Sequence, residues 1–502
     1  MASLAKSGAI SSVFVMYGAG AAFVATLIVS NSLGTSGAGD FFQVMALFAI
    51  GTSLSVFGSD TGLVRTVSAQ KATGRYSAIT SLIRFAAIPS VAICLAISSL
   101  TIGYAWLMPE LSESYRMMLS VTAAFLLCAT FMTICFGVLR GLGQVVLFTG
   151  LQNVLLPTLR IVAVFLVVTV AGNALALAFS WVIPVVVVAI VAFFAVRRSL
   201  PTEEDSLVEN PLPAETSRSF WSFSSARGVS AVVESILEWI DVLCVAAFVG
   251  VGASGVYGAV NRMVRVGVMV EHTGRIVTGP SISAALAVND YPRAQEIFLG
   301  NTRALIALSW PFYLTLAFFG PLLLEIFGHG FSSGAGVLWV ICPAMMVAIA
   351  AGGVQSVLLM SGKSRWQLYN KLSSLAVSLL LNFTLVPVWG LYGAVVAWSA
   401  AILVDTFLAS YEVFFLVGIR SSLSQLLPVM GIAGGIPTAV ALLVVIWLGV
   451  TWWSLLVYLS IAIALYCSAI LVFKKSMGLE KLFNKRPQQT RVGKHFAPKK
   501  EV

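Results

Sequence analysis

Apolar stretches long enough to cross a bilayer recur along almost the whole chain, and they limit the folds open to it. Of its 502 residues, 59% are hydrophobic and only 10% are charged, whereas about 25% of a typical soluble chain is charged. About 20 apolar residues in a helix cross a hydrocarbon core of about 30 Å. Because backbone polar groups must be hydrogen-bonded inside the bilayer, long continuous stretches predict helices and not barrel strands. We therefore expect an all-α integral membrane protein.

The apolar stretches predict about fourteen transmembrane helices. The first follows Lys6 and could pass for a signal peptide, but the many stretches after it favour a retained helix. The expected spans, in residue numbers, are 9–32, 41–62, 79–107, 117–139, 145–171, 174–196, 220–249, 255–278, 304–327, 335–360, 367–388, 391–417, 425–449 and 452–473.

Basic residues predict the orientation of these spans. If the N-terminus is cytoplasmic, the outer loops contain a single basic residue, Arg116, and all other loop arginines and lysines face the cytoplasm. This asymmetry favours cytoplasmic N- and C-termini. The tail 474–502 holds nine of the basic residues, against two glutamates, and supplies most of the net charge of +10. Such a tail is typical of contact with anionic membrane lipids, and it does not indicate nucleic-acid binding.

Three short motifs recur in order at an offset of 218 or 219 residues. They pair Gly34–Phe42 with Gly252–Gly258, Gly143-Gln144 with Gly362-Lys363, and Gly172–Ala174 with Gly390–Ala394. Duplicated halves are a common design among transporters, so we expect two pseudo-symmetric six-helix lobes plus two C-terminal helices. The expected domains are an N-lobe at 1–198 (helices 1–6), a cytoplasmic linker at 199–219, a C-lobe at 220–420 (helices 7–12), helices 13–14 at 421–473 and a basic cytoplasmic tail at 474–502.

The expected span 220–249 carries four ionisable side chains, Arg227, Glu234, Glu238 and Asp241. At 100° per residue they fall within about 60° of one another on the helix surface. An ionisable group inside a span costs roughly 2.5–3.5 kcal/mol, so this face must meet the protein interior or water. The three acids either bind a coupling ion or form structural ion pairs, and the pattern leaves both interpretations open.

Deep in the membrane the positive charges are all arginines. Arginine stays charged in almost any setting and binds phosphate oxygens through two parallel hydrogen bonds. A partly cationic cavity between two lobes favours an anionic ligand such as a phosphate or pyrophosphate group. The candidate substrate-binding residues are Arg160, Arg227, Arg262 and Arg265.

Other polar features have structural interpretations. Asp60 and Arg65, at the inner end of the second span, are predicted to form a structural pair. Gly362-Lys363-Ser364 resembles the end of a nucleotide-binding loop, but Val357 occupies the position where that loop needs glycine. The cysteines lie in apolar spans without a C-x-x-C motif, which favours small buried residues over metal ligands (94, 128, 135, 244, 342 and 467). We expect no metal, cofactor or catalytic residue.

Several glycine-rich motifs resemble those of the polysaccharide flippases, in the multidrug/oligosaccharidyl-lipid/polysaccharide exporter superfamily. The motifs are Gly34–Phe42, Gly58–Arg65, Gly255–Arg262 and Gly390–Val395, and the resemblance covers roughly residues 5–420. It implies two six-helix lobes around a cavity, alternating access, and a polyprenyl-pyrophosphate-linked glycan as substrate. It also implies cavity arginines at the pyrophosphate, with Arg262 at the recurrent basic position. The acidic face of span 220–249 departs from the family pattern.

The sequence therefore predicts a flippase, and not an enzyme, that translocates a lipid-linked oligosaccharide across a bacterial plasma membrane for surface polysaccharide biosynthesis. Its partners would be that substrate, membrane lipids and other polysaccharide-assembly proteins, but no nucleic acid. One alternative is a cation-coupled multidrug antiporter of the same superfamily. Others are a non-transporting scaffold and a membrane glycan polymerase or ligase, which the short outer loops disfavour.

Overall fold

The computed structural model describes residues 2–170, 174–200, 214–361, 363–419 and 423–473. Their elements are helical, with π-helical segments η1 and η4 and one 3-10 turn, η3. They are α1 (Ala2–Val56), α2 (Ser59–Ala72), α3 (Ser77–Leu107), α4 (Glu113–Ala124), α5 (Leu126–Gly141), α6 (Val145–Gly150), η1 (Leu151–Leu155), α7 (Leu156–Val170), α8 (Ala174–Ser199), α9 (Ala214–Phe248), α10 (Val251–Ala287), α11 (Tyr291–Glu325), η3 (Phe331–Gly334), α12 (Ala335–Ala350), α13 (Val354–Met360), α14 (Ser364–Trp389), α15 (Leu391–Glu412), η4 (Val413–Val417), α16 (Leu423–Leu448) and α17 (Trp452–Phe473).

Within the described chain, eleven helical stretches are long and apolar enough to cross a membrane. The first of them belongs to α1, which bends at Gly34 (φ 64°) and so supplies two arms. Two more helices, α9 and α10, have 35 and 37 residues but carry the charged side chains of the candidate site. Counting both arms of α1 and adding α9 and α10 brings the eleven stretches to fourteen. The predicted all-α membrane fold is confirmed.

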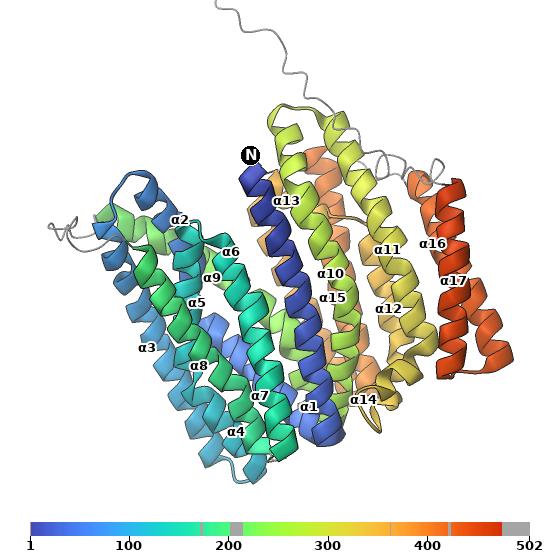
Figure 1. Ribbon diagram of the computed structural model, residues 1–502, viewed down its shortest axis with the longest axis horizontal. Helices are drawn as coiled ribbons and strands as arrows, with labels where there is room; N and C mark the ends of the chain where they lie inside the picture. The colour runs from blue at the N-terminus through green and yellow to red at the C-terminus, as the bar shows by residue number, and fades with distance from the viewer. Residues whose placement is uncertain (1, 171–173, 201–213, 362, 420–422, 474–502) are drawn as a thin grey trace, which may run out of the picture.

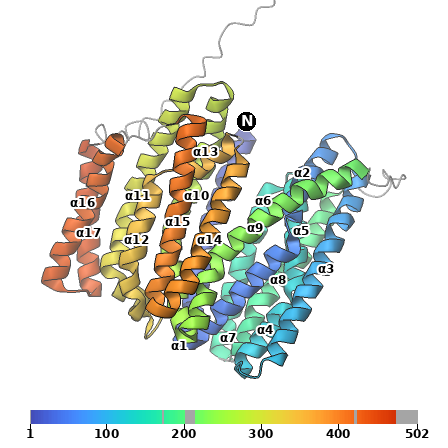
Figure 2. The same cartoon turned by 180° about the vertical axis from the view of Figure 1, so that it is seen from behind.

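The helices form two groups joined by α1 and α9. Figure 1 shows α2–α8 on one side and α10–α17 on the other, with the N-terminus and the end of α17 at the same end of the bundle. Figure 2 shows α9 running diagonally between the groups, from α2 to the far ends of α14 and α15. The predicted linker 199–219 lies largely outside the described residues, and the tail 474–502 lies wholly outside them.

The first repeated motif forms a close contact between α1 and α10, which we call the glycine seam. It joins Gly34–Phe42 of α1 to Gly252–Gly258 of α10, at the end of the bundle away from the N-terminus. A Cβ atom on Gly39 would overlap the Val251 carbonyl oxygen, and one on Gly255 would overlap the carbonyl oxygen of Thr35. The backbones of the two halves therefore touch with no side chain between them.

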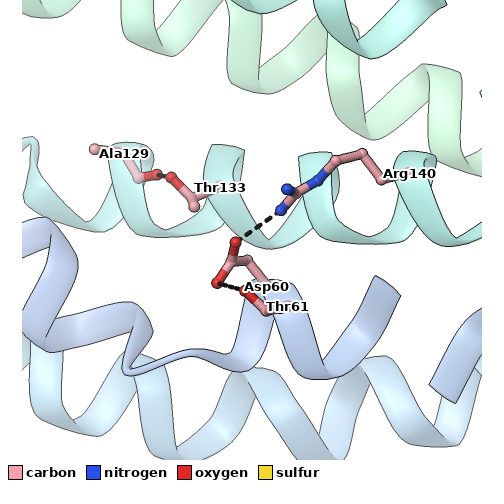
Figure 3. Close-up of polar contacts among 5 residues, drawn as sticks. All are labelled: Asp60, Thr61, Ala129, Thr133 and Arg140. Atoms are coloured by element: carbon pink, nitrogen blue, oxygen red, sulfur yellow. Dashed lines mark hydrogen bonds and ion pairs between the residues drawn. The ribbon is translucent and has the colours of Figure 1, made fainter. Parts of the chain in front are cut away.

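An ion pair connects α2 to α5 (Figure 3). Arg140 Nη2 lies 2.7 Å from Asp60 Oδ2, whereas Arg65 packs 4.7 Å over the ring of Phe223 on α9. The predicted pairing of Asp60 with Arg65 is therefore wrong. Five residues apart, the two side chains lie about 140° apart around the helix, so they face different neighbours.

We predict that Gly39→Ala destabilises the protein and that Gly20→Ala on the same helix does not. The added methyl group at position 39 must push aside backbone of α10, at a cost of about 1–3 kcal/mol. At position 20 nothing lies within 4 Å of a Cβ atom, and alanine favours a helix by roughly 0.5–1 kcal/mol. Thermal unfolding of the purified variants in one detergent measures both. Equal midpoints for the two variants would show that the seam is not close-packed.

Candidate functional site

Arg160 and Arg262 belong to different halves, and both lie over aromatic rings. The guanidinium of Arg160, on α7, lies 4.1 Å from the ring centre of Trp181 on α8. That of Arg262, on α10, lies 4.9 Å from the ring of Trp239 on α9 and 6.0 Å from that of Phe42 on α1. Arg262 is eleven residues into α10, about 16 Å along its axis, near the middle of a membrane core of about 30 Å.

A chain of aromatic rings connects the two arginines. The ring centres of Trp181 and Phe41 are 5.2 Å apart, and those of Phe41 and Phe42 are 6.0 Å apart, both pairs edge to face. Trp181 carries Arg160 at one end of this chain, and Phe42 faces Arg262 at the other. We call Arg160, Arg262 and these rings, with Trp239, the arginine–aromatic cluster.

Neither arginine of the cluster forms an ion pair with a described residue, although Glu238, beside Arg262, lies close enough to attract it. The Nε atom of Arg160 is buried and has no hydrogen-bond partner in the described part of the chain. Arg160 also interacts unfavourably with the positive charge of Arg262. A cation–π contact with a ring stabilises a desolvated guanidinium by about 2 kcal/mol. This is only part of the hydration free energy that the guanidinium loses on burial. The cluster therefore has unmet capacity to bind an anion.

Arg265, one turn after Arg262, is paired. Its Nη1 atom donates to Glu238 Oε1 at 2.7 Å, its Nε to Asn261 Oδ1 at 2.5 Å, and its Nη2 to the Glu238 carbonyl oxygen at 3.2 Å. A hollow beside this pair has room for about one water molecule. It is lined by Phe42, Glu238, Trp239, Val242, Gly258, Asn261, Arg262 and Arg265.

Asp241 is buried and hydrogen-bonded on both oxygens. Asn382 Nδ2, on α14, donates to Asp241 Oδ1 at 2.6 Å, and the Tyr257 hydroxyl donates to Oδ2 at 3.1 Å. Asp241 is held by Asn382 and Tyr257, and Glu238 is held by Arg265. These contacts favour structural pairing, one of the two interpretations that the sequence left open for the acids. Glu234 is exposed and has no partner among the described residues, so its role as an ion-coupling residue stays a prediction.

Arg227 lies apart from the other candidate arginines. It is exposed, and it precedes Glu238 by eleven residues, about 16 Å along α9. Its neighbour Gly228 packs against Phe57, where α9 meets α2. The structure thus brings three of the four predicted arginines to one region and leaves Arg227 towards the end of the bundle that bears the N-terminus.

Sequence reasoning did not identify the aromatic and amide members of these contacts. Phe41 and Phe42 belong to the repeated motif, so the repeat was a signal that could have found them. Trp181 and Trp239 stand among many aromatic residues of a membrane protein, and no spacing distinguishes them. Asn382 lies on α14, and the sequence does not show which face of this helix is buried. That face is determined by the packing of α14 against α9 and α15.

Comparison with known proteins identifies the family. Residues 4–273, more than half of the chain, match the family model described as polysaccharide biosynthesis protein. The chain belongs to this family. A curated relative, the probable low-salt glycan biosynthesis flippase Agl15 of Haloferax volcanii, is 23% identical over 468 residues, which cover 89% of this chain and 93% of the relative.

Solved structures share the fold. The lipid II flippase MurJ in an inward closed conformation matches with a TM-score of 0.70 at 12% identity, over 93% of this chain and 99% of that one. A multidrug resistance MATE family transporter of the MOP superfamily, inward-facing, matches with a TM-score of 0.60 at 15% identity, over 81% and 96%. The predicted family resemblance is confirmed by the family model, and the chain shares the fold of these two proteins.

We predict that Asp241→Asn destabilises the protein and that Glu234→Gln, on the same helix, leaves its stability unchanged. Asparagine at 241 loses the charge-assisted bonds from Asn382 and Tyr257, each worth about 1.5–3 kcal/mol. Glu234 makes no such bond in the described structure. Thermal unfolding of the two purified variants distinguishes these roles, and an unchanged midpoint for Asp241→Asn would argue against structural pairing.

Proposed function

We propose that the protein is a flippase that moves a polyprenyl-pyrophosphate-linked oligosaccharide across a bacterial plasma membrane for surface polysaccharide biosynthesis. The observation that carries this proposal is the arginine–aromatic cluster, in which arginines from both halves lie near mid-membrane and neither forms an ion pair among the described residues. Membership of the polysaccharide biosynthesis family and similarity to a probable glycan flippase support it.

A pyrophosphate fits the chemistry of the cluster. It carries negative charge on two neighbouring phosphates, and each guanidinium binds one phosphate through parallel hydrogen bonds. The rings around Arg160 and Arg262 keep water away, which strengthens the attraction between the arginines and the anion. Arg265 would join the site by exchanging Glu238 for the substrate.

The proposed cycle follows from where the halves touch. With the termini cytoplasmic, the glycine seam closes the outer end of the bundle. The headgroup would enter between the halves from the cytoplasm while the lipid tail stays in the bilayer. Separation of Gly39 from α10 would then open the outer end. Arg227, towards the cytoplasmic end of α9, would meet the headgroup early, before it reaches Arg160 and Arg262.

A drug/cation antiporter is the second candidate, and one observation favours it. Glu234 is an exposed acid inside an expected span, without a described partner, as a site for cationic drugs would require. The two functions differ in which residues matter, because antiport would depend on Glu234 and glycan flipping on Arg160 and Arg262.

We predict that Arg160→Gln and Arg262→Gln each reduce flipping by about 10- to 100-fold, since a hydrogen bond to a charged group contributes about 1.5–3 kcal/mol. Arg227→Gln should have a smaller effect. In cells depleted of the wild-type protein, the two severe variants should lose surface polysaccharide and accumulate polyprenyl-pyrophosphate glycan on the cytoplasmic leaflet.

The matched control is Arg84→Gln, which alters an exposed arginine on α3 and should restore wild-type glycan levels. Normal surface polysaccharide with both severe variants, at wild-type protein levels, would overturn the flippase proposal. Drug sensitivity caused by Glu234→Gln with normal glycan would instead support antiport.

A further inference from the structure

One face of α14 is polar along most of its buried length. Asn370, Ser374, Ser378 and Asn382 recur every fourth residue, and none is more than 2% exposed. They extend about 18 Å along the helix axis, more than half of a hydrocarbon core of about 30 Å. At one end of this polar stripe Asn382 holds Asp241 of α9. The function proposed above does not use the other end.

At that other end the stripe meets two carboxylates of α15. Asp405 and Glu412 are seven residues apart and so share a face of the helix. Lys371 Nζ lies 2.8 Å from Asp405 Oδ2, and Asn370 Nδ2 donates to Glu412 Oε2 at 2.7 Å. Glu412 is 7% exposed, and its one hydrogen bond in the described part of the chain comes from a neutral amide.

The charges of this group do not balance. The group holds one lysine, paired with Asp405, and two carboxylates, so a single negative charge remains when both acids are ionised. Glu412 also lies close enough to feel the repulsion of Asp405. An uncompensated charge inside a membrane protein costs several kcal/mol, and binding one proton removes it.

Two acceptor oxygen atoms at these acids lack a hydrogen-bond donor. Asp405 Oδ1 and Gln355 Oε1 are buried without a partner among the described residues, and the hydroxyl of Ser374 is buried without one as well. Gln355, on α13, is held at this place because its Nε2 atom donates to the Asp405 carbonyl oxygen at 3.5 Å. Ser374, on the polar stripe, is 2% exposed. Acceptors without donors favour the arrival of a proton.

Among the described residues, the elements around the group add one other charge, the exposed Arg365 in the first turn of α14. Among the elements that pack against α15, α12 and α13 contain no acidic or basic residue, and neither does η4. The last turn of α9 reaches α15 at the far end, where Val249 lies near Gly390, and its first turns cross to α2 (Figure 2). Lys371 is thus the cation that pairs with Asp405, and no described cation pairs with Glu412. The π-helical turn that follows Glu412 is of a kind common at functional sites.

We propose that Glu412, with Asp405 and Lys371, forms a proton-binding site in the C-terminal half of the protein. A proton fits better than a metal ion, because the Lys371 ammonium already occupies the cation position at Asp405 and Asn370 presents a donor to Glu412. Protonation of Glu412 replaces a charge-assisted hydrogen bond between α14 and α15 with a weaker neutral one. If the proposed flippase function holds, this site supplies its coupling ion.

Difference infrared spectroscopy of the full chain in lipid nanodiscs tests the site without any substrate. In sodium-free buffer, lowering the pH should produce the carbonyl band of a buried protonated carboxylic acid, and Glu412→Gln should remove that band. Glu325→Gln, which alters an exposed glutamate at the end of α11, should retain it. In Asp405→Asn, Glu412 no longer feels the negative charge of Asp405, so the band should appear only at a lower pH.

The outcomes separate this proposal from the flippase proposal. A pH-dependent band that persists unchanged in both Glu412→Gln and Asp405→Asn overturns the proton site, whatever the protein transports. A band that sodium removes at constant pH also overturns it, in favour of a metal-ion site. Loss of the band in Glu412→Gln supports the site even if Arg160→Gln and Arg262→Gln leave surface polysaccharide unchanged, a result that would refute only the flippase.

Discussion

A hydrocarbon core offers no hydrogen-bond partner, so every charged group inside it must be satisfied by the protein or by a ligand. This constraint divides the ionisable side chains into those that have a partner within the protein and those that do not. Glu238 and Arg265 satisfy each other, and Asp241 is satisfied by a tyrosine and an amide. Arg160 and Arg262 lie over rings, and neither forms an ion pair with a described acid, although Glu238, which pairs with Arg265, lies near enough to attract Arg262. What the protein leaves unsatisfied is the best guide to what it binds.

The glycine seam determines how near the two halves come to each other. Because Gly39 and Gly255 have no side chains, the backbones of α1 and α10 meet directly. Three residues after Gly39, Phe42 reaches towards Arg262, and through Phe41 the rings continue to Trp181 and the other half. A bulkier seam would hold α1 and α10 further apart and separate Phe42 from Arg262.

The sequence alone predicted the helices, because the length of an apolar stretch is a local property that the bilayer converts directly into a span. The repeat also predicted where α1 and α10 resemble each other. It could not show that these segments touch, or that Asp60 reaches Arg140 on α5 instead of Arg65. Helical periodicity tells which residues share a face but not which helix that face meets. Periodicity placed Arg227 and Asp241 on the same helix face, yet in the structure Arg227 is exposed and Asp241 is buried.

Arg160 and Arg262 sit on helices that belong to different halves, and this has a thermodynamic consequence. A ligand held by both arginines stabilises whichever arrangement keeps them together, in proportion to its concentration over its dissociation constant. By reciprocity, separation of the halves lowers the affinity for the ligand by the same factor by which the ligand favours the closed arrangement. A site divided in this way needs no separate mechanism for release, because the motion that exposes the ligand to the far side also dismantles the site.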